Sequence, residues 1–514
     1  MKPKEFNNLP MRDVSGGMMS AVEDTYIPDA ACRLSLGFRY DHIGRAKQRE
    51  GYTKLGGLVS ATTSDGLTGF VNAAGTLNRV VTAYGGTNYA YDGSAWYNIG
   101  GGMVSGTRVR YASMLDRVFR VGGGADTKSW NGQTASTFDT TQLSGAPNGS
   151  LIQSFKSKLY IAGNSTYPDR LFFSTIPDVS GNIDWAQSTQ YLDVNPADGD
   201  NITALMKTGT QMLIFKKDFI YRWNGTSTDA EPVINVGTIS QETVANCNGM
   251  IIFFHPKGVF MTDGGIPVEI SRPINNFIEA IPASNYSSMC AYADKDRFGL
   301  FCGDVTVDGR VFSNLVLEYD VNIKAWQPHV LAHSFRVFAT VHDSAGAEFI
   351  AGAKSSYVES MFSGNTDDGE PIVFERETRR MDFDGLYTQK RLNDFSFYLS
   401  GAPGSLFEGL PHNENGDKLD PVTIGSSQEG QVIVKGKDVR GNKISFKISG
   451  TNRGTPAEWR GFDILAGRSM GMIYRTNSNF SAIPTPAPAA TVYRITPEGD
   501  LRVTPESYTR SVYA

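Results

Sequence analysis

The feature that most constrains the fold of this chain is a two-part unit that recurs about every 45 residues. Each copy contains an apolar run, a short turn, a second apolar run and then a polar turn residue near a glycine or an aromatic residue. The clearest copy is residues 212–215 followed by residues 219–225. The polar turn residues of the seven copies are at positions 92, 131, 174, 224, 263, 320 and 363, with gaps of 39, 43, 50, 39, 57 and 43 residues.

A period of roughly 40 to 50 residues is typical of the blades of a β-propeller, each of which is a four-stranded antiparallel sheet. A blade cannot bury both of its faces alone, whereas blades packed radially against one another bury both. This packing explains apolar runs such as residues 250–254, which do not alternate with polar residues. A β-sandwich would not explain so many evenly spaced copies. We therefore predict an all-β chain with a β-propeller of six to eight blades, seven being the best count, over residues 56–370.

The residues at the blade turns are predicted to be structural. Four of the six tryptophans lie at these turns, where we expect them to pack between blades rather than to stack on a ligand. The predicted structural blade-turn residues are Asp92, Trp96, Trp130, Asn131, Trp223, Asn224, Asp263, Asp320 and Trp326.

The chain changes character near residue 370, and its two ends differ from the repeat region. Residues 371–480 contain longer runs that mostly alternate apolar and polar residues, as half-buried antiparallel strands do, and predict a small β-sandwich-like domain. Residues 481–514 are predicted to be a linker, rich in proline and alanine, and a C-terminal tail. Residues 1–55 contain no propeller unit and are predicted to form an extended N-terminal arm with short strands.

Composition excludes several classes of protein. The chain has 514 residues, of which 40% are hydrophobic and 20% charged, as in ordinary globular proteins. Its net charge is -5 and it has no cluster of Lys and Arg of the kind found on nucleic-acid-binding faces. No stretch approaches the roughly 20 apolar residues of a membrane span, and the first eight residues contain no secretory signal. We therefore predict no membrane partner.

No sequence pattern predicts a chemical site. His329 and His333 are four residues apart in a strand-rich context, which does not suit a helical metal site. The residue stretches 193–201 and 365–370 contain calcium-ligand residue types without the EF-hand spacing, so we expect solvated turns. The four cysteines are too few for a disulfide scaffold, and Cys290 and Cys302 are expected to be apolar side chains in a sheet. We predict no enzyme activity, no catalytic residues, no cofactor and no metal ion.

An enzymatic propeller is the alternative that the residues leave open. The turn at Asp92 and Gly93 lacks the Ser-x-Asp-x-Gly-x-x-Trp pattern of sialidase-type propellers. A cluster of arginines that grips a carboxylate would have to assemble from separate blades, and the sequence alone does not exclude it.

Two parts of the sequence resemble phage tail and DNA-stabilisation propeller proteins. The resemblance extends over about 300 residues at motif level, and no single residue is diagnostic. The first part comprises residues 196–205, 212–217 and 220–225. The second part comprises residues 24–32, 45–49 and 51–55, which end in a basic-Gly-Tyr turn.

The resemblance implies a structural protein of a tailed-bacteriophage virion, assembled in the host cytoplasm. Such a protein is a subunit of a homo-oligomeric ring, often sixfold, at the tail hub, the nozzle or the head-to-tail junction. It conducts or retains the genome, allows transient non-specific passage of DNA, seats tail fibres and contacts other tail or portal-proximal proteins. The alternative function is a glycan-binding or glycan-cleaving propeller at a virion or cell surface.

The regions outside the propeller are expected to make the ring. A closed propeller hides its strand edges, whereas extended segments can add strands to a neighbouring subunit. We therefore expect that removal of residues 1–50, or separately of residues 484–514, leaves a folded propeller that assembles poorly.

Overall fold

The structure is a computed structural model. It describes residues 5–11, 13–40, 44–343, 345–383, 389–400, 404–412, 422–423, 430–452, 454, 456–469, 493–495 and 501–503. The chain divides into two compact units, Met1–Gly471 and Met472–Ala514. The described part of the second unit is a hairpin of β42 (Tyr493–Ile495) and β43 (Leu501–Val503), and the predicted linker lies outside the described residues. Among the described residues, no helix is both long and apolar enough to cross a membrane.

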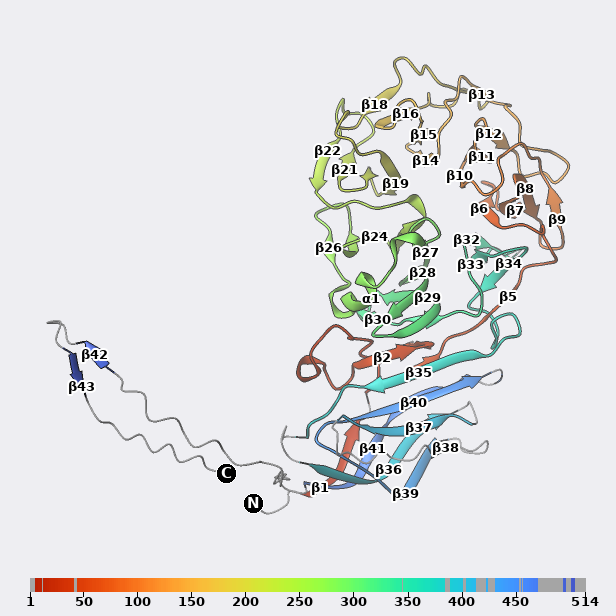
Figure 1. The fold of residues 1–514 in the computed structure, drawn as a ribbon. Helices are drawn as coiled ribbons and strands as arrows, with labels where there is room; N and C mark the ends of the chain where they lie inside the picture. Colours follow the sequence, from red (N-terminus) through yellow and green to blue (C-terminus); the bar gives the residue numbers. More distant parts are fainter. Residues whose placement is uncertain are drawn as a thin grey trace. The chain divides into compact units, whose positions relative to one another are not determined.

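Seven antiparallel sheets form the blades of a β-propeller, which confirms the predicted fold class (Figure 1). Blade 1 contains β6 (Ser64–Val71), β7 (Asn78–Tyr84), β8 (Thr87–Tyr91) and β9 (Trp96–Asn98). Blade 2 contains β10 (Val109–Met114), β11 (Arg117–Gly122) and β12 (Lys128–Trp130). Blade 3 contains β14 (Leu151–Phe155), β15 (Lys158–Ala162), β16 (Arg170–Phe173) and β18 (Tyr191–Asp193). Blade 4 contains β19 (Ile202–Thr208), β20 (Gln211–Lys216), β21 (Ile220–Trp223) and β22 (Glu231–Ile234).

The remaining three blades complete the ring. Blade 5 contains β23 (Val244–Cys247), β24 (Met250–His255), β25 (Gly258–Thr262) and β26 (Val268–Glu269). Blade 6 contains β27 (Cys290–Asp294), β28 (Arg297–Val307), β29 (Arg310–Asp320), β30 (Ala325–Trp326) and β31 (His329–Val330). Blade 7 contains β32 (Val337–His342), β33 (Glu348–Ala353), β34 (Val358–Met361) and β5 (Tyr52–Lys54).

A few short elements connect or flank the blades. The parallel pair β13 (Leu143–Ser144) and β17 (Ile183–Asp184) lies in the connections before and within blade 3. The helical elements are η1 (Asp24–Tyr26), η2 (Gln241–Thr243), η3 (Arg272–Ile274), α1 (Asn275–Glu279) and η4 (Ala283–Asn285).

The apolar runs of the repeat become the core between blades. Blade 1 packs on blade 2 through a cluster that includes Phe70 and Trp130, and blade 7 packs on blade 1 through one that includes Val341 and Val80. Further clusters join blades 2 and 3, 3 and 4, 4 and 5, 5 and 6, and 6 and 7. Each blade is therefore buried on both faces by its neighbours.

Two further sheets form a sandwich. One has the order β2 (Cys32–Leu36), β35 (Ile372–Thr378), β40 (Ile444–Asn452), β37 (Leu406–Pro411) and β38 (Val422–Thr423). The other has the order β3 (Phe38–Arg39), β4 (Ala46–Gln48), β41 (Glu458–Ser469), β36 (Lys390–Ser400) and β39 (Gly430–Gly441), and β1 (Glu5–Met11) also pairs with β41. Aromatic rings from both sheets meet in the core, where the ring centroids of Phe446 and Phe462 are 4.8 Å apart.

The first 55 residues are not the extended arm that the sequence suggested. Strands β1 to β4 belong to the two sandwich sheets, and β5 is the fourth strand of blade 7. The range predicted for the sandwich, residues 371–480, therefore leaves out four strands that the sandwich contains. The range predicted for the propeller, residues 56–370, leaves out one strand of blade 7. A single strand that completes a sheet formed by distant residues is not part of a local repeat, so the sequence period did not reveal it.

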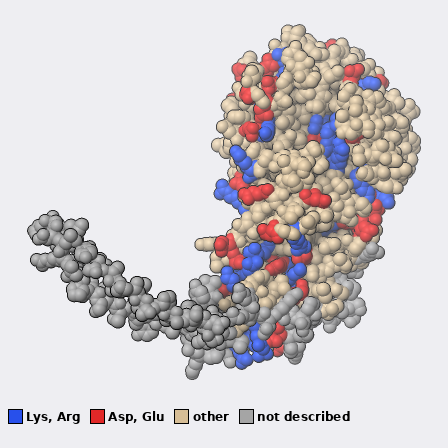
Figure 2. Space-filling model, viewed as in Figure 1, with Lys and Arg blue, Asp and Glu red and all other residues tan. Residues whose placement is uncertain are grey.

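Figure 2 shows acidic and basic side chains interspersed over one face of the molecule. Basic side chains also gather near the middle of the propeller part of this face.

Candidate functional site

The predicted polar turn residues end the third strand of their blades or follow it directly. Asp92 accepts the backbone N–H groups of Ser94 and Ala95 at 2.9 and 3.0 Å. Asn131, Asn224, Asp263 and Asp320 likewise accept the N–H group two residues further on. These side chains stabilise tight turns in the manner of Asx turns, and the structure does not bring them together into one site.

The four predicted tryptophans contact the preceding blade or the residue that directly follows its last strand. The ring of Trp223 in blade 4 lies 5.6 Å from that of Tyr160 in blade 3, between centroids. Trp130 in blade 2 lies 6.2 Å from Phe70 in blade 1. The indole N–H groups of Trp96 and Trp326 donate to the carbonyl oxygens of Leu55 and Ile270. In each case the tryptophan helps to join two blades.

The acidic loops that resembled calcium ligands have protein partners. Asp198 accepts two hydrogen bonds from the buried Lys216 ammonium group at 2.7 and 2.8 Å, and Asp193 pairs with Arg170. Within the described residues, no group of three or more His, Cys, Asp or Glu side chains is placed to hold a metal ion. All four cysteines are free and buried.

The candidate functional site lies where the N-terminal segment meets the propeller. We call it the closure junction: the contacts that residues 38–40 and 44–54 make with blades 6 and 7. Strand β5 pairs with β34, so Tyr52 lies opposite Met361. The hydroxyl group of Tyr52 is 2.8 Å from Nδ1 of His333. A Cβ atom on Gly51 would lie 1.9 Å from the carbonyl oxygen of Thr366, so only glycine fits there.

Arg49 anchors this strand through a buried ion pair. Its Nη1 and Nη2 atoms donate to the two carboxylate oxygens of Asp367 at 2.8 and 2.5 Å, and both side chains are at most 2% exposed. Nη2 also donates to the carbonyl oxygen of Val330 in blade 6. A two-point guanidinium–carboxylate pair fixes orientation as well as distance.

Arg39 makes a second buried pair, from the sandwich into blade 6. Its Nε and Nη2 atoms donate to Glu318 at 2.9 and 2.5 Å, and its guanidinium lies 3.5 Å from the ring centroid of Phe362. Glu318 also accepts the hydroxyl group of Tyr292 at 2.6 Å and lies 3.2 Å from Nε2 of His329. Burial disfavours the charged carboxylate, but the adjacent Arg39 outweighs it and holds the pKa of Glu318 well below its usual range.

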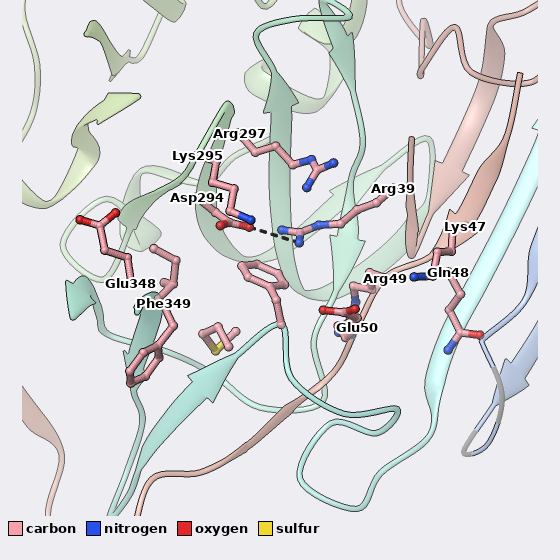
Figure 3. Close-up of a pocket in the computed structure, with 13 residues that line it drawn as sticks. Arg39, Lys47, Gln48, Arg49, Glu50, Asp294, Lys295, Arg297, Glu348 and Phe349 are labelled. Atoms are coloured by element: carbon pink, nitrogen blue, oxygen red, sulfur yellow. Dashed lines mark hydrogen bonds and ion pairs between the residues drawn. The ribbon is translucent and has the colours of Figure 1, made fainter. Parts of the chain in front are cut away.

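A cavity of about 290 Å³ lies at the closure junction (Figure 3). Figure 3 shows Arg39 and Asp294 pointing toward each other, and their charged atoms are 3.3 Å apart. Arg49 and Arg297, which also line the cavity, pair with Asp367 and Asp320. Each of these arginines has a carboxylate partner. The arrangement is therefore better suited to holding the N-terminal segment against blades 6 and 7 than to proton transfer or nucleophilic chemistry.

Sequence reasoning missed the residues of this site. Arg39 and Glu318 are 279 residues apart in the sequence, and Arg49 and Asp367 are 318 apart. No spacing rule links such pairs. The one signal in the sequence was the basic-Gly-Tyr turn at residues 49–52.

Comparison with known proteins gives a limited result. No family model and no curated protein matches the chain. Solved structures that match include the computationally designed Ika8 protein, with 12% identity over 60% of this chain and 99% of that one and a TM-score of 0.37. YCF48 from Cyanidioschyzon merolae matches with 10% identity over 61% and 98% of the two chains and a TM-score of 0.37. The extracellular domain of the one-component system BT4673 from B. thetaiotaomicron matches with 11% identity over 79% and 59% and a TM-score of 0.40.

The sheet order of the chain and the hydrophobic clusters between its blades make it a propeller.

Proposed function

We propose that this protein is a structural subunit of a tailed-bacteriophage virion. It forms a homo-oligomeric ring at the tail hub, the nozzle or the head-to-tail junction, and the ring conducts or retains the genome and seats tail fibres. The observation that carries the proposal is the closure junction. The N-terminal segment, whose sequence resembles phage propeller proteins, supplies strands to both the sandwich and blade 7, and Arg49, Gly51 and Tyr52 fix it against blade 7 and the connection that follows that blade.

This arrangement suits a subunit that transmits force. Both ends of the propeller-forming stretch enter the same sandwich, because β2 pairs with β35 and β4 pairs with β41. A further ion pair joins Arg310 of blade 6 to Glu375 of the sandwich at 2.7 Å. A load applied to the sandwich would therefore reach the propeller through paired strands and buried charges rather than through a flexible linker.

The sandwich also offers an edge for assembly. Strand β39 is 12 residues long and pairs with β36 on one side only, among the strands that the structure describes. The outer strands of the blades are shorter, such as the two residues of β26. A long strand edge is a template for pairing with another chain, so β39 is the edge that we assign to contacts between subunits.

The propeller axis is not the route for DNA in this proposal. Arg110 of blade 2 pairs with Glu242, which precedes blade 5, at 2.7 and 2.8 Å. Blades 2 and 5 are not neighbours, so this pair crosses the axis. DNA would pass through the centre of the ring of subunits, where a net charge of -5 per chain disfavours tight binding.

Native mass spectrometry of the full-length protein tests the proposal. We expect a single closed oligomer of defined mass, and weaker assembly after removal of residues 484–514, which lie largely outside the described residues. A chain that stays monomeric at high micromolar concentration, or that binds duplex DNA tightly at physiological salt, would contradict the proposed function.

A further inference from the structure

A second cavity, of about 430 Å³, lies where the first strands of blades 2 and 3 begin. We call it the mouth pocket. It is lined by Arg108 and Arg110, by glycines of both blades, and by hydroxyl and amide side chains that include Asn148 and Asn164. The volume is within the usual range for ligand sites. Its walls contain no aromatic side chain among the described residues, so it has no surface on which a nucleobase would stack.

The two arginines of the mouth pocket differ in their partners. Arg110 forms a two-point pair with Glu242 and donates to the carbonyl oxygen of Ser150. The pKa of Glu242 lies below its usual value, because Arg110 outweighs the effect of burial. The charge of Arg110 is therefore already compensated within the protein.

The charge of Arg108 is not compensated in this way. Its Nη1 and Nη2 atoms donate to the backbone carbonyl oxygens of Arg336 and Ser287 at 2.6 and 3.2 Å. No ion pair within 4 Å among the described residues includes Arg108 or Arg336. Arg336 in turn donates to the carbonyl oxygen of Gly106 at 2.8 Å, so two guanidinium groups lie close together. Two carboxyl groups act on Arg108 from beyond ion-pair distance: Glu242, which is already paired with Arg110, and the buried Asp65, whose pKa burial raises.

The backbone around Arg108 leaves room for a ligand to come close. Gly122, Gly123 and Gly124 have φ angles of +84°, +66° and +63°, and they form part of the pocket wall. Residues with a side chain are strained at these positive φ angles, whereas glycine is not. The three glycines therefore place no side chain in this part of the pocket wall. A small polar anion could therefore approach Arg108 while its other groups contact the amide and hydroxyl side chains.

We propose that the mouth pocket binds the carboxylate of an acidic sugar through Arg108. A guanidinium with no carboxylate within ion-pair distance favours an oxyanion, and the neutral polar wall suits the hydroxyl groups of a sugar ring. The proposal concerns binding alone and requires no bond to be made or broken. It also does not depend on the ring, since one chain contains the whole pocket.

Isothermal titration calorimetry of the full-length protein with sodium glucuronate, glucose and sodium phosphate tests this proposal. We expect glucuronate to bind at least tenfold more tightly than either glucose or phosphate. Arg108→Met should weaken glucuronate binding tenfold or more, as expected for loss of a charged hydrogen bond. The matched control is Arg272→Met, whose side chain is 83% exposed in the segment after blade 5 and which should leave the affinity unchanged.

A second variant keeps the test decisive if Arg108→Met does not fold. Asn164 accepts the N–H groups of Thr166 and Tyr167 through its carbonyl oxygen, and an aspartate could do the same. The amide group of Asn164 also donates to the carbonyl oxygen of Asn148 at 2.7 Å, and the aspartate variant loses only this exposed hydrogen bond. Asn164→Asp should therefore fold, and its negative charge at the pocket wall should weaken glucuronate binding several-fold. Unchanged affinity in both variants would overturn the site. Equal binding of phosphate and glucuronate, of glucose and glucuronate, or preferred binding of a single-stranded oligonucleotide, would overturn the assignment to an acidic sugar.

Discussion

The propeller and the sandwich are built from the chain in opposite ways. In the propeller, consecutive residues form consecutive blades except for β5 in blade 7, and each of these hydrophobic clusters joins neighbours in the ring. In the sandwich, strands that precede the propeller alternate with strands that follow it, as in the pairing of β2 with β35 and of β4 with β41. One chain thus combines a propeller, whose contacts are mostly local in sequence, with a sandwich that forms only when the segments before and after the propeller pair with each other.

The largest effect should come from deletion of residues 1–50. The sequence alone suggested that a folded propeller would remain, but the structure indicates otherwise. The deletion removes β1 to β4 and leaves Glu318 and Asp367 buried without Arg39 and Arg49. Breaking a buried pair costs about 3 to 5 kcal/mol, so two losses are comparable to the whole stability of about 5 to 15 kcal/mol typical of a domain. Circular dichroism and thermal unfolding should show no cooperative fold.

Deletion of residues 484–514 is the matched control for this truncation. These residues belong to the second compact unit, so unfolding of the first unit should be unchanged. A cooperative transition after deletion of residues 1–50 would show that the propeller does not need the closure junction.

A single substitution at the closure junction should have the next largest effect. Arg49→Met leaves the Asp367 carboxylate buried without its cation and should lower the free energy of unfolding by about 3 to 5 kcal/mol. The double variant Arg49→Met with Asp367→Leu should recover most of this loss, because it removes the orphaned charge. Urea titration measures both values. Arg272→Met, at an exposed ion pair, should change stability by less than about 1 kcal/mol.

Within the propeller, Trp223→Ala should destabilise the protein by about 3 to 5 kcal/mol. The indole is 3% exposed, packs on Tyr160 and Phe173 of blade 3, and donates to the carbonyl oxygen of Ser227. Denaturant titration decides the size of the effect. A loss below about 1 kcal/mol would mean that the packing between blades 3 and 4 depends little on this ring.

The smallest effect should come from a titration in the sandwich. Burial lowers the pKa of His412 to about 4, and the nearby cation Arg380 adds to this effect. The folded state favours the neutral ring, so the unfolded chain binds the proton first as the pH falls. The contribution of His412 is complete above about pH 6.5 and is lost by about pH 4, for a total of about 2 kcal/mol after allowance for its partial exposure.

Urea titrations between pH 7 and pH 4 measure this contribution. In His412→Gln the slope of stability against pH should be smaller than in the unaltered protein over this window. Because burial also lowers the pKa of His329 in blade 6, some slope should remain in the variant. Identical slopes in the two proteins would contradict a role for His412.

The sequence predicted the propeller because its information is local. The polar markers at positions 92, 131, 174, 224, 263, 320 and 363 all end or follow the third strand of a blade, since each blade repeats the same turn. The fourth strand of blade 7 was missed because it comes from residues 52–54, far from the rest of its sheet. Alternation revealed the sandwich strands β36, β39, β40 and β41, while the N-terminal partners β3 and β4 are too short to show a period.

The sequence contained almost no signal for the candidate site, because the residues that pair in it are also far apart in the chain. Arg39, Arg49, Glu318 and Asp367 are charged residues that ordinary statistics place on the surface. Only the fold shows that each is buried beside a partner about 300 residues away. Arg108, Arg110 and Arg336 come together from the starts of blades 2 and 7, and the sequence left a cluster of arginines from separate blades as an open alternative.

Differential scanning calorimetry of the full-length protein tests most directly the claim that propeller and sandwich form one body held by the closure junction. The account predicts one cooperative transition for the first compact unit, with equal calorimetric and van't Hoff enthalpies. It also predicts that Arg49→Met lowers the midpoint of that whole transition. Two separate transitions, of which Arg49→Met shifts only one or neither, would contradict the account.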